Sequence, residues 1–125
     1  MRHWIAGLLL IPSLAAADPV LECDGASQVE IGACVEGQLE AVDRAVETAL
    51  GFARASAAEL DAVTERTEAV PALEAAQSAW TAYRDAQCDY AGALFGGGSG
   101  TGIGIAGCRI ELGRARVMEL LGGLN

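Results

Sequence analysis

Four carboxylates recur in the first half of the chain at spacings of four, three and four residues: Glu36, Glu40, Asp43 and Glu47. On a helix this spacing places all four side chains along one face. Two neighbouring carboxylates can perform glycosidase chemistry, but that needs one acid kept protonated in a dry site, and nothing around these residues indicates a pocket. Calcium binding would need a loop of alternating oxygen ligands, which the sequence does not show. We therefore interpret the four acids as candidate partner-binding residues on a solvated face, and we expect no enzyme activity, metal site or cofactor.

A second group of side chains lies in the middle of the chain and recurs at helical spacing: Leu73, Gln77, Trp80, Arg84 and Cys88. A helix face that carries an indole, a guanidinium and a sulfur usually fixes the helix to its neighbours. We therefore interpret Trp80 as a core residue and expect Arg84 to pair with a carboxylate such as Asp43 on another helix. The alternative is that Trp80, Tyr83 and Arg84 form an exposed hot spot, because interfaces favour these side-chain types.

The first 17 residues have the features of a cleavable secretory signal peptide. Arg2 supplies the positive start, residues 5–14 the apolar run, and residues 15–17 a small-residue cleavage site. The apolar run is too short to span a bilayer, and no cysteine follows the cleavage site, so we expect no membrane anchor. This predicts a periplasmic or secreted protein with one domain over residues 18–125.

The charge of the expected mature chain is strongly negative. Residues 18–125 contain 17 acidic side chains and seven arginines, with no lysine or histidine, which gives a net charge of −10. The acids concentrate in residues 18–74, where 13 acids face three arginines. This charge argues against nucleic acid as a partner and can steer a cationic protein toward one face.

Four cysteines follow the predicted cleavage site: Cys23, Cys34, Cys88 and Cys108. An even number of cysteines in a small exported domain favours two disulfides over metal binding, and no CxxC pair argues otherwise. Three connectivities are possible. We favour Cys23 with Cys34 and Cys88 with Cys108, which close the short loops.

The first predicted helix begins after Ser27, where Glu30 completes a capping box. It extends to about Ala55, because apolar residues recur on one face at steps of three and four: Ile31, Val35, Leu39, Val42, Val46, Ala49 and Ala53. Residues 57–70 could form a short fourth helix, a continuation or a loop.

Two further helices follow. One begins near Pro71 and ends near Ala91, and the other extends from about Ile105 to Leu121, with Cys108, Leu112 and Ala115 facing inward. We interpret the glycine-rich residues 96–104 as a flexible connection, since the lysine of a phosphate-binding loop is absent. With no alternating strand pattern, the sequence predicts an all-α, disulfide-stapled bundle of three main helices, to which Trp80, Tyr83, Phe52 and Phe95 supply the bulky contacts.

Three segments of the chain resemble a known family. They are Cys34 followed nine residues later by Asp43; the group Gln77, Trp80, Arg84, Asp85 and Cys88; and 97–99 leading to Cys108, Leu112, Arg116 and Leu120. The pattern is similar to the LprI-type lysozyme-inhibitor family of exported bacterial proteins, over nearly all of residues 18–125. The chain departs from it at Val46, Glu47 and Leu50, where the family usually has a Leu-Asn pair and a tyrosine, and at Gly113, where threonine is usual.

The resemblance implies a helical exported domain and lysozyme inhibition, an activity of some members only. It also assigns structural or binding roles to the family-motif residues Asp43, Gln77, Trp80, Arg84, Asp85 and Arg116. Our first hypothesis is that the acidic face occludes a cationic lysozyme. The alternative is a periplasmic or envelope interaction module whose partner is another exported protein.

Overall fold

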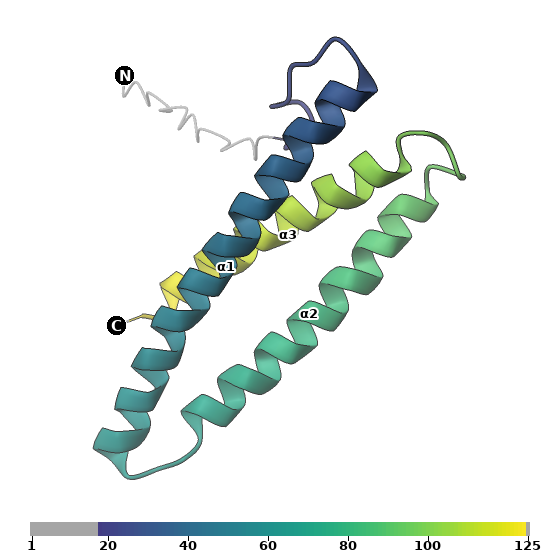
Figure 1. Cartoon of the computed structure of the whole chain (residues 1–125). Helices are drawn as coiled ribbons and strands as arrows, with labels where there is room; N and C mark the ends of the chain where they lie inside the picture. The colour runs from purple at the N-terminus through teal and green to yellow at the C-terminus, as the bar shows by residue number, and fades with distance from the viewer. Residues whose placement is uncertain (1–17, 125) are drawn as a thin grey trace, which may run out of the picture.

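A computed structural model of the chain describes residues 18–124, in which three helices account for most of the structure. They are α1 (Gln28–Thr64), α2 (Ala69–Ala93) and α3 (Thr101–Gly122). Helices α1 and α2 form a long hairpin, and α3 returns from the end of α2 and crosses behind α1 (Figure 1). The prediction of an all-α bundle with three main helices is confirmed. The predicted signal peptide, residues 1–17, lies outside the described residues.

Helix α1 begins where the capping box predicted. The Ser27 hydroxyl accepts a hydrogen bond from the Glu30 backbone N–H at 3.3 Å, and the Glu30 carboxylate accepts one from the Ala26 N–H at 2.7 Å. The helix does not stop near Ala55 but continues to Thr64. It ends at Glu65, whose φ of 55° is left-handed. Most of the segment that could have formed a short fourth helix is therefore a continuation of α1.

The end of α1 also supplies the cap of α2. The Asp61 carboxylate accepts hydrogen bonds from the backbone N–H groups of Glu68, Ala69 and Val70, at 3.2, 2.9 and 3.0 Å. These donors, Val70 first and then Ala69, hold the pKa of Asp61 below its ordinary value. One side chain thus fixes the turn between the two helices and satisfies N–H groups that have no partner inside α2.

Helix α3 begins four residues earlier than predicted. Only residues 94–100 form the connection, with Gly96 and Gly97 at positive φ, and the helix starts at Thr101. Gly104, predicted to be loop, lies in the first turn of α3, where any β-carbon would clash with the Phe95 ring. The glycine run therefore serves close packing as well as chain reversal.

The predicted apolar face of α1 is confirmed, since all seven of its residues are buried or partly buried. Six of them, all but Val46, contribute to two apolar clusters. One contains Val35 and Ile110, and the other contains Leu50 and Leu120. The inward prediction for Ala115 was wrong, because this residue is exposed on α3.

Three of the four aromatic residues that were expected to fill the core are half exposed or more. The exposed fractions of Phe52, Tyr83 and Phe95 are 58, 55 and 50%. Trp80 alone is partly buried between the helices. Small side chains, above all Ala49 and Ala106, fill much of the interior instead and allow the helices to approach closely.

Both predicted disulfides are confirmed. Cys23–Cys34 connects the N-terminal segment, residues 18–27, to α1, and Cys88–Cys108 connects α2 to α3. The N-terminal segment is held further by Glu22, which receives two hydrogen bonds from the Arg114 guanidinium at 2.9 and 2.8 Å. This pairing lowers the pKa of Glu22. The sequence analysis did not anticipate it.

Candidate functional site

A layer of polar side chains lies between the two apolar clusters. This polar layer contains Asp43, Gln77, Arg84, Arg109 and Arg116, and Arg84 lies at its centre. Arg84 Nη2 donates to Asp43 Oδ1 on α1 at 2.7 Å, as predicted, and also to the Arg109 carbonyl on α3 at 2.7 Å. Arg84 Nε donates to the same carbonyl at 3.1 Å. The arginine side chain is only 12% exposed. One guanidinium therefore connects all three helices, and its charge is matched by that of Asp43.

The Trp80 ring lies beside two guanidinium groups. The Cζ atoms of Arg84 and Arg116 are 5.2 and 5.8 Å from the ring centroid, within cation–π distance. Arg116 Nε donates to Gln77 Oε1 at 3.0 Å, and its Nη1 pairs with Glu119. These contacts join α2 to α3 from inside the bundle, so Trp80 and Arg84 do not form the exposed hot spot considered above.

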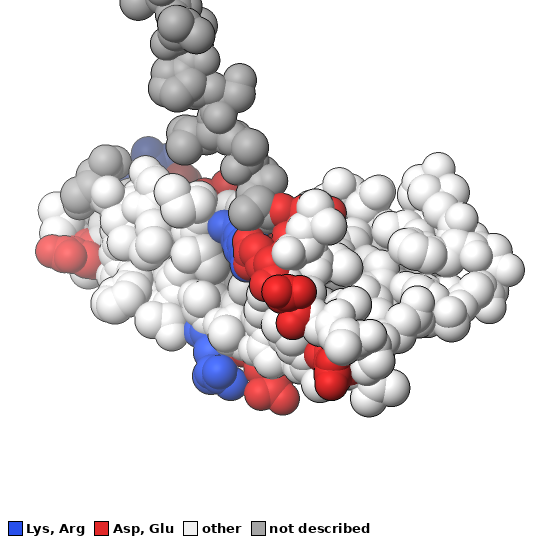
Figure 2. Space-filling view, turned by 90° about the horizontal axis from the view of Figure 1, so that it is seen from above, with Lys and Arg blue, Asp and Glu red and all other residues white. Residues whose placement is uncertain are grey.

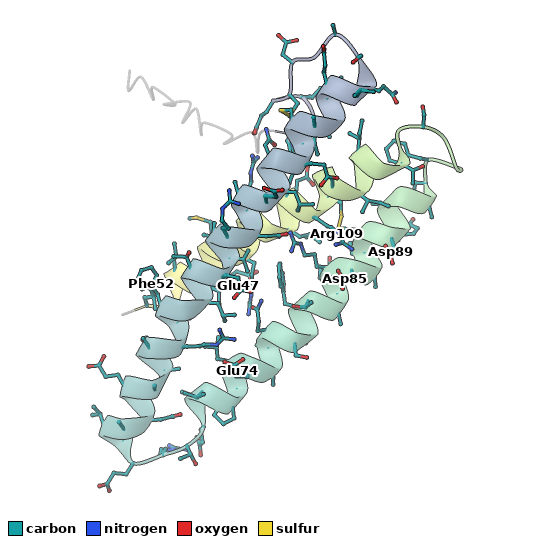
Figure 3. All side chains as sticks on the ribbon, in the orientation of Figure 1. Glu47, Phe52, Glu74, Asp85, Asp89 and Arg109 are labelled. Atoms are coloured by element: carbon teal, nitrogen blue, oxygen red, sulfur yellow. A yellow bond between two sulfur atoms is a disulfide. The ribbon has the colours of Figure 1, made fainter. Side chains whose placement is uncertain are left out.

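Asp85, the last of the motif residues, lies at the edge of this layer. Its carboxylate pairs with Arg109 Nη2 at 3.3 Å, and the two labelled side chains approach each other between α2 and α3 in Figure 3. Arg109 was not singled out from the sequence. Its main contribution is a backbone carbonyl, which no residue pattern indicates.

Gly113 makes room for the polar layer. A β-carbon at this position would clash with Val42 Cγ1 and would lie 3.3 Å from Arg84 Nη2. The departure from the family pattern at Gly113 therefore coincides with close packing of α1 on α3 beside the central arginine.

The four candidate partner-binding acids all lie on the exposed side of α1. Asp43 is engaged by Arg84 although its side chain remains 52% exposed, and Glu40 forms only a loose pair with Arg44 at 3.7 Å. Glu36 and Glu47 have no ion pair within the described residues. We call these four residues the acidic stripe. Figure 2 shows one face of the molecule, on which acidic side chains gather near the middle beside basic ones, with further acidic side chains at the left and lower edges.

Residues 18–124 show neither a metal-ligand cluster nor a membrane-spanning helix. No group of three or more cysteine, histidine or acidic side chains in this range could hold a metal ion. None of the three helices is long and apolar enough to cross a membrane.

The model of the family described as Lysozyme inhibitor LprI matches residues 23–120. The chain belongs to this family. The LprI match begins at Cys23 and ends at Leu120, so it contains both disulfides and the whole polar layer.

The LprI chain also has a relative among curated proteins. It is 34% identical over 113 residues to an uncharacterized protein of Rhizobium meliloti (strain 1021), covering 84% of this chain and 80% of the relative. No solved structure matches the chain. The family is described as a lysozyme inhibitor, and its motif residues in this chain connect the three helices.

Proposed function

We propose that this LprI-family protein is an exported inhibitor, periplasmic or secreted, that binds a cationic lysozyme through the acidic stripe. The observation that carries the proposal is the family match over residues 23–120. The exposure of Glu36, Glu40 and Glu47 on one side of α1 supports it, and so do the two disulfides, which are typical of oxidising compartments.

The mechanism is occlusion of the enzyme's cleft. Carboxylates of the acidic stripe pair with arginines and lysines around that cleft, and the net charge of −10 over residues 18–125 increases the rate of encounter. Asp43 contributes differently from the other three acids. Because Arg84 fixes its carboxylate, Asp43 keeps α1 in register with α2 and α3 and adds charge to the stripe.

The test is turnover of cell-wall substrate by a cationic lysozyme, with and without the purified oxidised protein. Inhibition should rise with dose and weaken as salt increases, because exposed charges are screened beyond about 8 Å at 0.15 M ionic strength. Inhibition that persists unchanged at about 300 mM salt contradicts this mechanism, since the Debye length there is well below 8 Å.

Charge reversal locates the surface. Glu36→Lys should weaken inhibition and flatten its salt dependence. Asp89→Lys is the matched control, because it makes the same change in net charge at an exposed position on α2 (Figure 3). Equal effects of the two substitutions would show that only total charge matters and that the acidic stripe is not the contact surface.

The second candidate is an interaction module for another exported protein. It is favoured by an open apolar groove at one end of the bundle, away from the acidic stripe. Absence of inhibition at a hundredfold excess of the protein over lysozyme would rule out inhibition of that enzyme and favour this candidate.

A further inference from the structure

The α1–α2 hairpin is longer than the helix that packs on it. At 1.5 Å per residue, the 37 residues of α1 extend about 55 Å and the 22 residues of α3 only about 33 Å. Helix α3 ends part-way along α1, and the hairpin continues beyond it (Figure 1). The far end of the bundle therefore has two helices where the rest has three.

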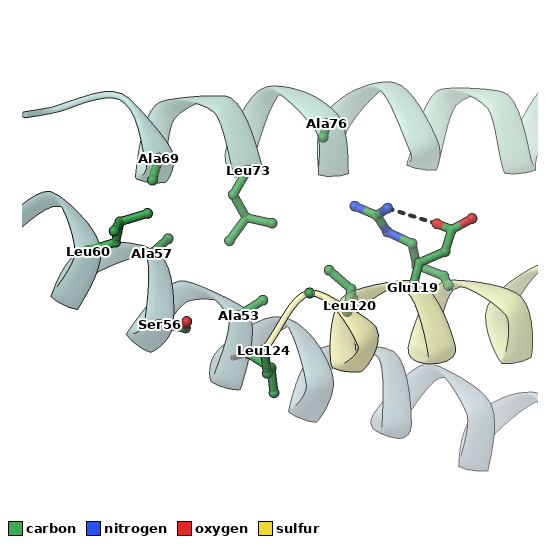
Figure 4. A pocket seen from close by; sticks show the side chains of 12 residues that line it. Ala53, Ser56, Ala57, Leu60, Ala69, Leu73, Ala76, Glu119, Leu120 and Leu124 are labelled. Atoms are coloured by element: carbon green, nitrogen blue, oxygen red, sulfur yellow. Dashed lines mark hydrogen bonds and ion pairs between the residues drawn. The ribbon is translucent and has the colours of Figure 1, made fainter.

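The inner face of this uncovered end remains apolar. A groove of about 330 Å³ lies there, and Leu60 of α1 and Ala69 and Leu73 of α2 point toward the same space in Figure 4. Ala53 and Leu120 line it where α3 ends. The α1 residues of the groove continue the same helical face that α3 covers farther along, so the groove follows the path that a longer α3 would take.

Two adjoining hollows enlarge this surface, and both include Leu60. Leu60 is 55% exposed and Val63, in one of the hollows, is 77% exposed. A leucine on the core-facing side of a long helix is normally covered by another element, and here the described residues leave more than half of it exposed.

The rim of the groove is acidic. The residues that line the groove and the two hollows include four acids, Glu59, Asp61, Glu68 and Glu119, and two arginines, Arg66 and Arg116. Arg66 pairs with Glu68 and Arg116 pairs with Glu119, so the net negative charge of this lining comes from Glu59 and from Asp61, which caps α2. A second copy of this chain would bring a like charge to the groove, whereas a cationic segment would be attracted.

We propose that the open end of the hairpin is a docking groove for an amphipathic helix with basic flanks, supplied by a partner protein. The apolar face of that helix would take the place that α3 leaves empty, and its basic flanks would meet the acidic rim. This binding surface is separate from the acidic stripe, and it does not depend on lysozyme being the partner.

The experiment uses a synthetic 18-residue peptide with leucines at helical spacing on one face and arginines and lysines on its flanks. It is titrated into the full oxidised protein, and binding is measured by fluorescence anisotropy. We expect saturable binding that weakens with salt. A scrambled peptide of the same composition should bind at least about tenfold more weakly, because it cannot present one apolar face. Equal binding of the two peptides would overturn the proposal.

Two variants connect the binding to the groove. Leu60→Glu should weaken peptide binding by about tenfold or more, as expected for a central apolar contact. Val29→Glu, at an 82% exposed position near the other end of α1, should bind like the unmodified protein. Circular dichroism checks that both variants are folded.

Equal affinities of the two variants for the peptide would overturn the proposal. A concentration-dependent dimer that Leu60→Glu dissociates would also overturn it, because the occupant of the groove would then be a second copy of the chain. Since the peptide contains no lysozyme sequence, its binding tests the groove whether or not lysozyme is inhibited.

Discussion

The two ends of the bundle are stabilised in different ways. The end that contains the chain's N-terminal segment and the glycine-rich connection has both disulfides, the Glu22–Arg114 pair and the larger apolar cluster. The opposite end has the Asp61 cap and the exposed Arg54–Glu74 pair, whose Nε and Oε1 atoms are 2.6 Å apart. Between them lies the polar layer around Arg84.

The difference shows how a domain with a small core can keep an apolar surface open. Covalent and long-range polar links hold the three helices together at one end, so the hairpin at the other end can project without a third helix. Its turn is fixed by local hydrogen bonds, which tolerate solvent on both sides. The region proposed to bind a partner is thus the end of the bundle that contains neither disulfide.

Loss of a disulfide should have the largest effect on this contrast. Replacing Cys88 and Cys108 together by alanine should lower the free energy of unfolding by about 3 kcal/mol, because the unfolded chain regains the entropy of a loop of some 20 residues. The same change at Cys23 and Cys34, which close a loop of 11 residues, should cost slightly less. Urea denaturation measures both values. A smaller loss for the longer loop would contradict the loop-entropy explanation.

Removal of the central arginine, Arg84, should cause the second-largest loss of stability. Arg84→Met leaves the Asp43 carboxylate and the Arg109 carbonyl without their donor, and we expect it to destabilise the fold by about 2–3 kcal/mol. Arg54→Met removes an exposed pair and serves as the comparison, with a much smaller loss expected. Thermal and urea unfolding of the two variants give the ranking. Similar losses would show that the polar layer is no more important than a surface ion pair.

Replacing glycine by alanine should change the free energy of unfolding in opposite directions at two positions. Gly113→Ala should destabilise by about 1–3 kcal/mol, because its β-carbon meets Val42 and Arg84 where α3 crosses α1. Gly51→Ala, which meets no atom within 4 Å on the exposed side of α1, should stabilise by about 0.5–1 kcal/mol by favouring the helix. Equilibrium unfolding separates the two outcomes. Stabilisation by both changes would mean that the helices do not pack closely at Gly113.

The smallest effect should come from the hairpin turn and depend on pH. The lowered pKa of Asp61 means that its ionised form stabilises the folded state, a contribution present at neutral pH and lost as the pH falls below about 4. Asp61→Ala should therefore lower the melting temperature by a few degrees at pH 7, and less at pH 3. Calorimetry at the two pH values provides the test. A pH-independent difference would show that the charge of Asp61 does not contribute.

Much of this fold could be predicted from the sequence, because local chemistry decides it. The capping box located the start of α1, and its three- and four-residue apolar repeat identified the buried face. The cysteine pairing and the Asp43–Arg84 contact also followed from side-chain type and spacing. Each of these features depends on groups that the sequence names directly.

Other features depend on tertiary packing and were missed. The end of α1 was undecided because no third helix packs there, so residues 57–64 need no strong apolar repeat. The start of α3 was placed too late, because Gly104 looks like a loop residue until the Phe95 ring is placed against it. The Arg109 carbonyl had no signal at all, since backbone acceptors are the same at every position.

The acidic stripe depends on local sequence, whereas the groove depends on tertiary packing. The stripe could be read from charge and periodicity, and its role in binding remains a prediction. The groove could not be read, because Ala57, Leu60 and Leu73 look like ordinary core residues until the short α3 leaves them uncovered. Only the relative lengths of the helices reveal it.

Each disulfide joins a cysteine to the next one along the chain, and this order has a consequence for biogenesis. When a chain enters an oxidising compartment from its N-terminus, Cys23 and Cys34 emerge before Cys88, and the first bond can close while the remainder is still being delivered. Successive pairing therefore yields the native connectivity directly. For a chain exported in this way, as proposed above, we expect that an oxidant suffices for maturation and that no isomerase is needed to exchange wrongly paired thiols.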